Sequence, residues 1–193
     1  MKELLLYQYF VDSIFSPRKT NMFQLMRKFI ITAIIVFAIN TLASSQTTTI
    51  LLFRHAEKDT SAPGSTAMRS DPPLSAEGIK RADRIPGVLI AYQPDSIYST
   101  NYTRTKSTVT PLAQKFNLGI QTYNPSDLAT FAERLLNNKG KVMVVAGHSN
   151  TTPALVNLLI KENKYAALDE SIYNQFWIVT IKEGKAEAIT VRY

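Results

Sequence analysis

Short apolar stretches of strand length recur along the chain between polar segments. They lie at 48–53, 95–99, 120–123, 142–146, 176–181 and 186–192. The first and fourth stretches are rich in branched and aromatic side chains, which is typical of strands buried on both faces. The last two flank Glu183-Gly184 and predict an antiparallel hairpin.

Helices are predicted between these strands, where apolar residues recur every three or four positions. The predicted helices run from 75 to about 85, from a first turn that contains Arg104 to the break at 117–119, from about 126 to 138, and over 154–160. Ser75 and Thr152 are the expected N-caps of the first and last helices, and Pro86 is expected to interrupt the first. Ala129 is assigned to the apolar face of the third. Strands separated by helices, followed by a hairpin, predict a three-layer αβα sandwich around a mixed, mostly parallel sheet.

The first 45 residues follow a different pattern. Arg27-Lys28 forms a basic patch, an apolar run follows, and Ala43-Ser44-Ser45 provides small residues. This is the layout of a secretory signal peptide, with Met26 as the expected translation start and cleavage expected after Ser45. An uncleaved anchor is the alternative, although the apolar run is shorter than the roughly 20 residues that a membrane-spanning helix needs.

Export defines the mature protein. We expect a periplasmic or secreted protein with no stable membrane span after processing. The mature part, 46–193, then forms a single domain of about 150 residues.

Composition excludes several classes of site. The sequence contains no cysteine, which excludes disulfides, lipid attachment through cysteine and thiolate nucleophiles or metal ligands. The formal net charge is +7, but the basic residues are spread along the chain without interleaved aromatic residues, so no nucleic-acid partner is expected. No carboxylate cluster follows a predicted strand, so no metal cofactor is expected either. The pattern favours no particular oligomeric state.

Candidate chemistry gathers where two predicted strands end. The sequence holds two histidines, and each follows a strongly apolar run. His55 follows Arg54 at the end of the first strand, and His148 follows the strand 142–146. Ligands of α/β proteins bind at the carboxyl ends of the strands. We therefore expect both histidines at the functional site.

With these residues the chain resembles the histidine phosphatase superfamily, branch 1, whose members include phosphoglycerate mutases and phosphohistidine phosphatases. Arg54-His55-Ala56-Glu57 resembles its Arg-His-Gly-Glu signature, Ser99–Thr105 its arginine-bearing motif, and Gly147–Asn150 its second histidine motif. Pro73–Gly78 resembles the start of the family's first helix. The resemblance implies a phosphoglycerate mutase-like fold and a metal-independent phosphatase that acts on a small phosphorylated substrate.

The implied catalytic mechanism is phosphoryl transfer through a phosphohistidine on His55. The expected phosphate-binding residues are Arg54, His55, Arg104, His148 and Ser149. Arginine forks match phosphate oxygens geometrically, and the start of the helix near Thr152 adds a positive helix end. The arginines are expected to lower the pKa of His55, and its second ring nitrogen is expected to donate to a backbone carbonyl.

The leaving group needs a proton, and its source is open. Asp127 and Glu133 are the only acidic residues between Arg104 and His148. Asp127 is the candidate general acid, with an N-cap as the equal alternative. Glu57 is expected to hold the loop or the second histidine in place. The loop 59–73 is expected to cover the pocket, with Arg69 as a solvated charge or a contact to the leaving group.

Four alternatives remain beside this hypothesis. A phosphoglycerate mutase-like enzyme is disfavoured because only 105–147 separates the arginine motif from the second histidine motif. A phosphohistidine-protein phosphatase fits the size but acts in the cytoplasm. A phosphate-binding module without turnover would share every cation. A serine hydrolase is disfavoured because Gly147–Thr151 lacks the second glycine of a nucleophile elbow and no histidine follows Ser149.

Overall fold

The computed structural model describes residues 27, 29–31, 46–61 and 71–193. The chain divides into two units, Met1–Ser44 and Ser45–Tyr193. The described residues of the first unit are helical. Most of the predicted signal peptide, its cleavage site and the loop position Arg69 lie outside the described residues. Within the described part of the chain, no helix has the length and apolar character to cross a membrane.

Six strands and four helices are described in the second unit. The strands are β1 (Thr48–Arg54), β2 (Ser96–Ser99), β3 (Ile120–Thr122), β4 (Val142–Gly147), β5 (Gln175–Lys182) and β6 (Lys185–Arg192). The helices are α3 (Ala76–Val88), α4 (Thr103–Phe116), α5 (Leu128–Asn137) and α6 (Thr151–Ile160).

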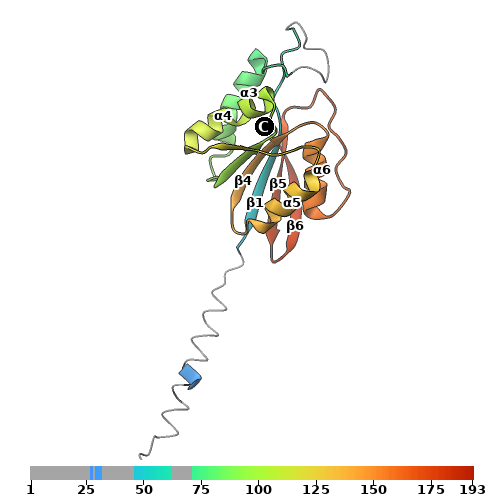
Figure 1. Cartoon of the computed structure of the whole chain (residues 1–193). Helices are drawn as coiled ribbons and strands as arrows, with labels where there is room; N and C mark the ends of the chain where they lie inside the picture. The colour runs from blue at the N-terminus through green and yellow to red at the C-terminus, as the bar shows by residue number, and fades with distance from the viewer. Residues whose placement is uncertain (1–26, 28, 32–45, 62–70) are drawn as a thin grey trace, which may run out of the picture. The chain divides into compact units, whose positions relative to one another are not determined.

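The strands form one mixed sheet in the order β3-β2-β4-β1-β5-β6. β3, β2, β4 and β1 are mutually parallel, whereas β5 pairs antiparallel with β1 and β6 completes the hairpin. Helices α3 and α4 cover one face, and α5 and α6 cover the other (Figure 1). The predicted αβα sandwich around a mixed sheet is therefore confirmed.

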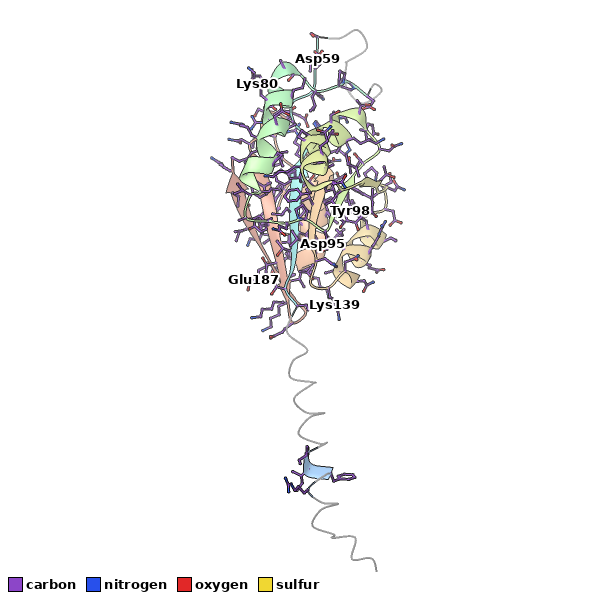
Figure 2. The ribbon with its side chains drawn as sticks, turned by 90° about the vertical axis from the view of Figure 1, so that its left-hand side faces the viewer. Asp59, Lys80, Asp95, Tyr98, Lys139 and Glu187 are labelled. Atoms are coloured by element: carbon purple, nitrogen blue, oxygen red, sulfur yellow. The ribbon has the colours of Figure 1, made fainter. Side chains whose placement is uncertain are left out.

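The strand β1 lies in the middle of this sheet and is buried on both faces. Ile50 and Leu52 pack into the cluster under α5 and α6, while Leu51 and Phe53 pack into the cluster under α3 and α4. Strands with this position lack the usual apolar and polar alternation, which explains the unbroken apolar run. Asp59 and Lys139 lie at opposite ends of the second unit (Figure 2), and β1 runs between these two ends.

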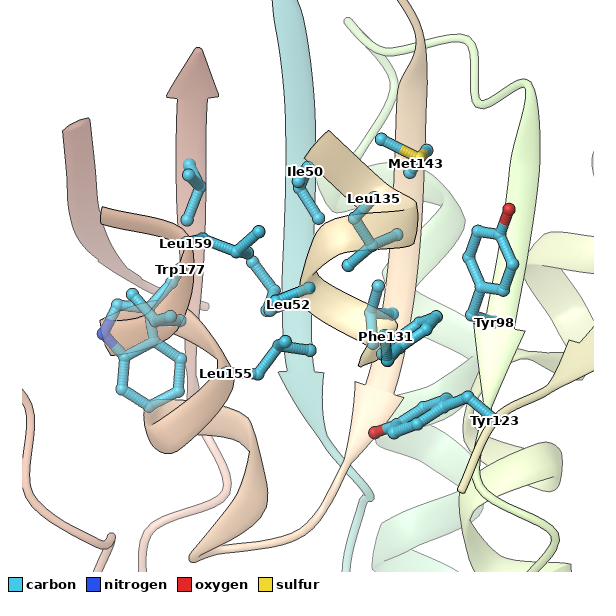
Figure 3. Close-up of a cluster of buried hydrophobic side chains, with 14 of the residues drawn as sticks. Ile50, Leu52, Tyr98, Tyr123, Phe131, Leu135, Met143, Leu155, Leu159 and Trp177 are labelled. Carbon is cyan, nitrogen blue, oxygen red and sulfur yellow. The ribbon is translucent and has the colours of Figure 1, made fainter. Parts of the chain in front are cut away.

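The cluster under α5 and α6 combines aliphatic and aromatic side chains (Figure 3). Tyr123 and Phe131 stack with ring centroids 4.1 Å apart, and Trp177 closes the far side next to Leu155. The fully buried Leu135 fills the space between Phe131 and Met143. Truncation of a buried leucine in such a core costs about 2–5 kcal/mol.

Three local predictions are wrong. Helix α3 continues to Val88 because Pro86 lies in its last turn, where the missing N–H costs only one helical hydrogen bond. Asn150, rather than Thr152, caps α6, and the Thr152 hydroxyl inside the helix donates to the Phe53 carbonyl at 3.2 Å. Ala129 is exposed, because α5 begins at Leu128 and turns this position to solvent.

Candidate active site

Neighbouring parallel strands bring the two histidines together. The register of β1 and β4 pairs Arg54 with Gly147, so the next residue of each chain segment leaves the sheet at the same edge. The His55 amide donates to the Gly147 carbonyl at 2.9 Å. The imidazole rings of His55 and His148 lie 5.5 Å apart between centroids, at an interplanar angle of 69°.

His55 is a buried neutral imidazole with one defined tautomer. Its Nδ1 lies 2.7 Å from the Ala56 carbonyl, which can only accept, so Nδ1 carries the proton and Nε2 keeps a lone pair. Burial, followed by the charges of Arg104 and Arg54, lowers the pKa of His55 to about 3. The prediction that the arginines lower this pKa is correct in direction, but burial is the larger cause.

His148 is fixed on several sides. Its Nε2 is hydrogen-bonded to the Thr100 hydroxyl at 3.0 Å, and its amide donates to the Thr151 hydroxyl at 3.1 Å. The Tyr102 ring and the imidazole are nearly perpendicular, with centroids 5.1 Å apart. Burial and the charges of the nearby arginines lower the pKa of His148 to about 4. Both histidines are therefore uncharged near neutral pH.

Arg104 lies in the first turn of α4, as predicted. Its guanidinium packs over the ring of Tyr102 at 4.6 Å, and Nη1 lies 3.5 Å from an Asp71 carboxylate oxygen. The Asp71 carboxylate also accepts from the amide and hydroxyl of Thr103, which fixes the start of the helix. The Nε of Arg104 is buried and has no hydrogen-bond partner among the described residues. An anion beside α4 would supply the missing acceptor.

Arg54 is the most buried of the predicted phosphate ligands, with 1% of its side chain exposed. Its Nη1 donates to the carbonyls of Asp169 at 2.9 Å, Glu170 at 3.2 Å and Ile172 at 2.9 Å. Its Nη2 donates to a carboxylate oxygen of Glu170 at 2.8 Å, and the ring of Tyr173 covers the guanidinium at 4.0 Å. From the sequence, the Arg54 guanidinium was expected to bind phosphate, whereas in the structure its terminal nitrogens bind the segment 169–172.

A cavity of about 510 Å³ opens beside the histidines. It is lined by His55, Lys58, Tyr102, Arg104, Pro125, Ser126, His148, Ser149, Asn150, Thr151 and Glu170. Four predicted phosphate ligands line it, whereas Arg54 is not among its lining residues. Sequence analysis missed Lys58, Tyr102, Glu170 and Tyr173. The sequence shows the acidic pair Asp169-Glu170, but no motif connects this pair with Arg54, more than a hundred positions earlier.

The predicted acids have partners of their own. Asp127 caps α5 by accepting from the Thr130 amide at 3.3 Å, and it is not among the residues that line the cavity. Both carboxylate oxygens of Glu57 accept from Arg81, which joins the loop after β1 to α3. Among the described residues, Glu57 therefore supports its own loop rather than His148. Within the same residues, no group of three or more His, Asp or Glu side chains could hold a metal ion.

Comparison with known proteins gives one family and several similar folds. Residues 50–125 match the sequence model of the histidine phosphatase superfamily (branch 1), a segment that includes Arg54, His55 and Arg104. No curated protein matches the sequence.

Several solved structures of similar fold are described as phosphatases. The protein histidine phosphatase SixA complexed with tungstate has a TM-score of 0.59 at 15% identity, covering 75% of this chain and 96% of that one. Phosphoserine phosphatase from Entamoeba histolytica has a TM-score of 0.58 at 14% identity, with coverages of 76% and 97%. Mycobacterial glucosyl-3-phosphoglycerate phosphatase has a TM-score of 0.56 at 14% identity, with coverages of 76% and 98%. At these identities the likeness shows the fold.

Proposed function

Since residues 50–125 match the histidine phosphatase superfamily (branch 1), we propose that the chain is a phosphatase that hydrolyses phosphate monoesters through a phosphohistidine on His55. One observation carries this proposal: a buried, neutral His55 with a free Nε2 faces His148 5.5 Å away, in a cavity that Arg104 also lines. A nucleophile for phosphorus needs this lone pair, and the transferring group needs the surrounding donors.

In the first step, Nε2 of His55 attacks phosphorus and the bond to the leaving oxygen breaks. The phosphoryl group moves to the imidazole, and the departing oxygen takes a proton from solvent. Arg104, the Ser149 hydroxyl and the positive end of α6 lie around the cavity and stabilise the equatorial oxygens. His148 adds a donor from the neighbouring strand end.

In the second step, water attacks the phosphohistidine. The N–P bond breaks, inorganic phosphate leaves, and the water's proton passes to solvent or phosphate. His55 returns to the neutral form that the Ala56 carbonyl orients. Each turnover thus consumes one water and needs no other reactant.

The proton for the leaving group separates two substrate classes. Glu170 is the one carboxylate among the residues lining this cavity, and its pKa is lowered by the Ser149 hydroxyl, Arg54 and Lys58, so it is ionised near neutral pH. Good leaving groups would therefore be favoured, such as aryl phosphates. The same feature supports a second candidate function, hydrolysis of phosphohistidine, whose imidazole leaves readily when protonated.

A substrate panel tests the proposal. The purified full chain is assayed with aryl phosphates, alkyl phosphates and phosphohistidine, with and without excess chelator. We expect turnover that persists in chelator and is inhibited by tungstate, a phosphate mimic. Loss of turnover in chelator, with recovery on adding a divalent cation, would contradict this mechanism.

We also propose that the protein is exported. The basic patch, the apolar run and the small residues before Gln46 support a cleaved signal peptide. Sequencing of the N-terminus of protein from its native host should begin at Gln46. A mature N-terminus upstream of Met26 would contradict both the cleavage and the predicted start.

A further inference from the structure

Glu170 connects two residues that the sequence assigned to phosphate binding. One carboxylate oxygen accepts from Nη2 of Arg54 at 2.8 Å, and the other accepts from the Ser149 hydroxyl at 2.7 Å. Lys58 Nζ approaches the Arg54-bound oxygen at 4.0 Å. We call the Arg54–Glu170–Ser149 arrangement the Glu170 bridge. It joins the end of β1 to the loop before α6.

The bridge holds a carboxylate between donors that suit an anion. Glu170 lines the same cavity as His55 and His148. A phosphoryl group, like a carboxylate, offers oxygens to an arginine fork and to a hydroxyl. The Glu170 carboxylate therefore occupies two donors that suit a phosphate, the Ser149 hydroxyl in the cavity lining and Nη2 of Arg54 outside it.

The bridge is attached unequally at its two ends. The Glu170 side chain is 68% exposed, whereas that of Arg54 is 1% exposed. Arg54 is also bound through Nη1 to three backbone carbonyls of the segment 169–172, which need no carboxylate. If the Glu170 carboxylate turned to solvent, Arg54 would keep its orientation and expose Nη2.

We propose that Glu170 is a displaceable carboxylate that occupies part of the phosphate site, so that phosphate groups bind in competition with it. This inference rests on the proposed function only in placing phosphate in this cavity. Glu170 would then determine substrate affinity. Only a substrate whose phosphoryl group displaces the carboxylate could accept hydrogen bonds from Arg54 and Ser149. A proton-donor role is disfavoured because the three groups around the carboxylate favour its charged form.

Tungstate binding to the full chain tests the proposal without requiring turnover. Calorimetry compares the wild type with Glu170→Gln, Glu170→Asp and the matched control Glu162→Gln, which removes an exposed carboxylate just after α6. We expect Glu170→Gln to bind tungstate about tenfold more tightly, the change expected if the bridge is closed in about nine molecules of ten. Glu162→Gln should bind as the wild type does.

Glu170→Asp separates displacement from a simple charge effect. Aspartate keeps the negative charge but is one methylene shorter, so it cannot span both donors from the same backbone position. We expect it to bind tungstate several-fold more tightly than the wild type. Wild-type affinity in Glu170→Asp, or unchanged or weaker binding in Glu170→Gln, would overturn the proposal.

Two further measurements keep the outcomes distinct. Thermal unfolding of each variant identifies loss of fold, and if Glu170→Gln does not fold, Glu170→Asp alone decides the question. In the ester assay, a kcat lowered more than tenfold by Glu170→Gln at unchanged KM would assign Glu170 to proton transfer and overturn the proposal. Tighter tungstate binding by a protein without any phosphatase turnover would instead refute the proposed function and retain the inference.

Discussion

The sheet has a hollow at each end, and the larger one is not beside the histidines. The amino-end cavity, about 640 Å³, lies where β1 begins and includes Thr48, Leu136 and Ile160, with Lys139, Lys161 and Lys185 among its polar residues. The histidine-end cavity has about 510 Å³. The lysines of the former are exposed, whereas the latter contains a His55 that is 4% exposed. Volume therefore does not distinguish the candidate active site, whereas its titratable groups withdrawn from water do.

The direction of the chain explains the difference. At the histidine end, β2 and β4 lead directly into α4 and α6, whose first turns carry positive helix ends and place Arg104 next to the strand edge. At the amino end, α6 finishes at Ile160 and its C-cap Lys161 adopts a left-handed conformation with φ of 58°. Cations there complement the negative helix end and remain in water. Four parallel strands thus give one end suited to anions and one suited to solvated lysines.

Replacing His55 by alanine should have the largest effect. Without Nε2 no phosphohistidine forms, and turnover should fall to the background of the uncatalysed reaction. Rapid quench without acid, followed by mass spectrometry, should find the phosphoryl group on His55 in the wild type and on no residue in the variant. A phosphoryl group on His148 or Ser149 would show that the nucleophile is assigned to the wrong strand end.

Replacing His148 by alanine should cost less, on the order of 10²–10³ in kcat, as for other single stabilising donors. Its role is to stabilise charge rather than to form a bond, so phosphohistidine should still accumulate on His55. The matched control is Thr110→Ala, a partly buried α4 hydroxyl that donates to the Lys106 carbonyl and is not part of the cavity lining. Equal losses of turnover in the His55 and His148 variants, with no phosphoenzyme in either, would contradict this division.

Acid should destabilise the protein through the histidine end. In the unfolded chain a histidine has a pKa near 6.5, whereas in the fold the pKa of His55 is about 3 and that of His148 about 4. Between these values the unfolded state binds more protons, so stability falls as pH decreases from 6.5 and the loss is complete only below the folded pKa values. The total should be several kcal/mol, because each unit of pKa shift corresponds to about 1.4 kcal/mol.

Urea unfolding followed by the fluorescence of the buried Trp177 measures this dependence. The window from pH 6.5 to 5 is the useful one, because the acidic side chains titrate below it. The double variant with alanine at His55 and His148 should lose much less stability across this window than the wild type. Equal slopes in both proteins would mean that the histidines are not held neutral by the fold.

The fold was predictable because its signals are local and repeated. The apolar runs of β1 and β4 indicated central strands, and Asn117, with φ of 52°, ends α4 as its sequence position suggested. Glu183 and Gly184 both adopt positive φ in the β5–β6 hairpin, as expected for a tight turn. The proximity of the two histidines was predictable from the same pattern. Each histidine follows a central strand, and parallel neighbouring strands end at the same edge of the sheet.

The environment of Arg54 was not predictable in this way. Its partners Asp169, Glu170 and Ile172 lie 115 to 118 positions away, in an irregular segment without periodicity. Asp127 shows the opposite limit: its cap to Thr130 spans three residues, so local geometry determines where the carboxylate points. Sequence patterns identified which residues carry chemistry, but long-range contacts decide which of them are available to a ligand.

The smallest effect should come from the amino end. Replacing Lys139, Lys161 and Lys185 together by alanine removes three exposed cations from the larger cavity, at the end of the sheet opposite His55. Charges separated by more than about 8 Å are largely screened at physiological salt, so KM and kcat for a phosphate ester should each change less than about twofold. The Arg104→Ala variant, which removes one cation from the histidine end, provides the contrast and should raise KM or lower kcat strongly. A triple lysine variant that loses turnover as Arg104→Ala does would mean that both ends of the sheet contribute to substrate binding, and the distinction between them would fail.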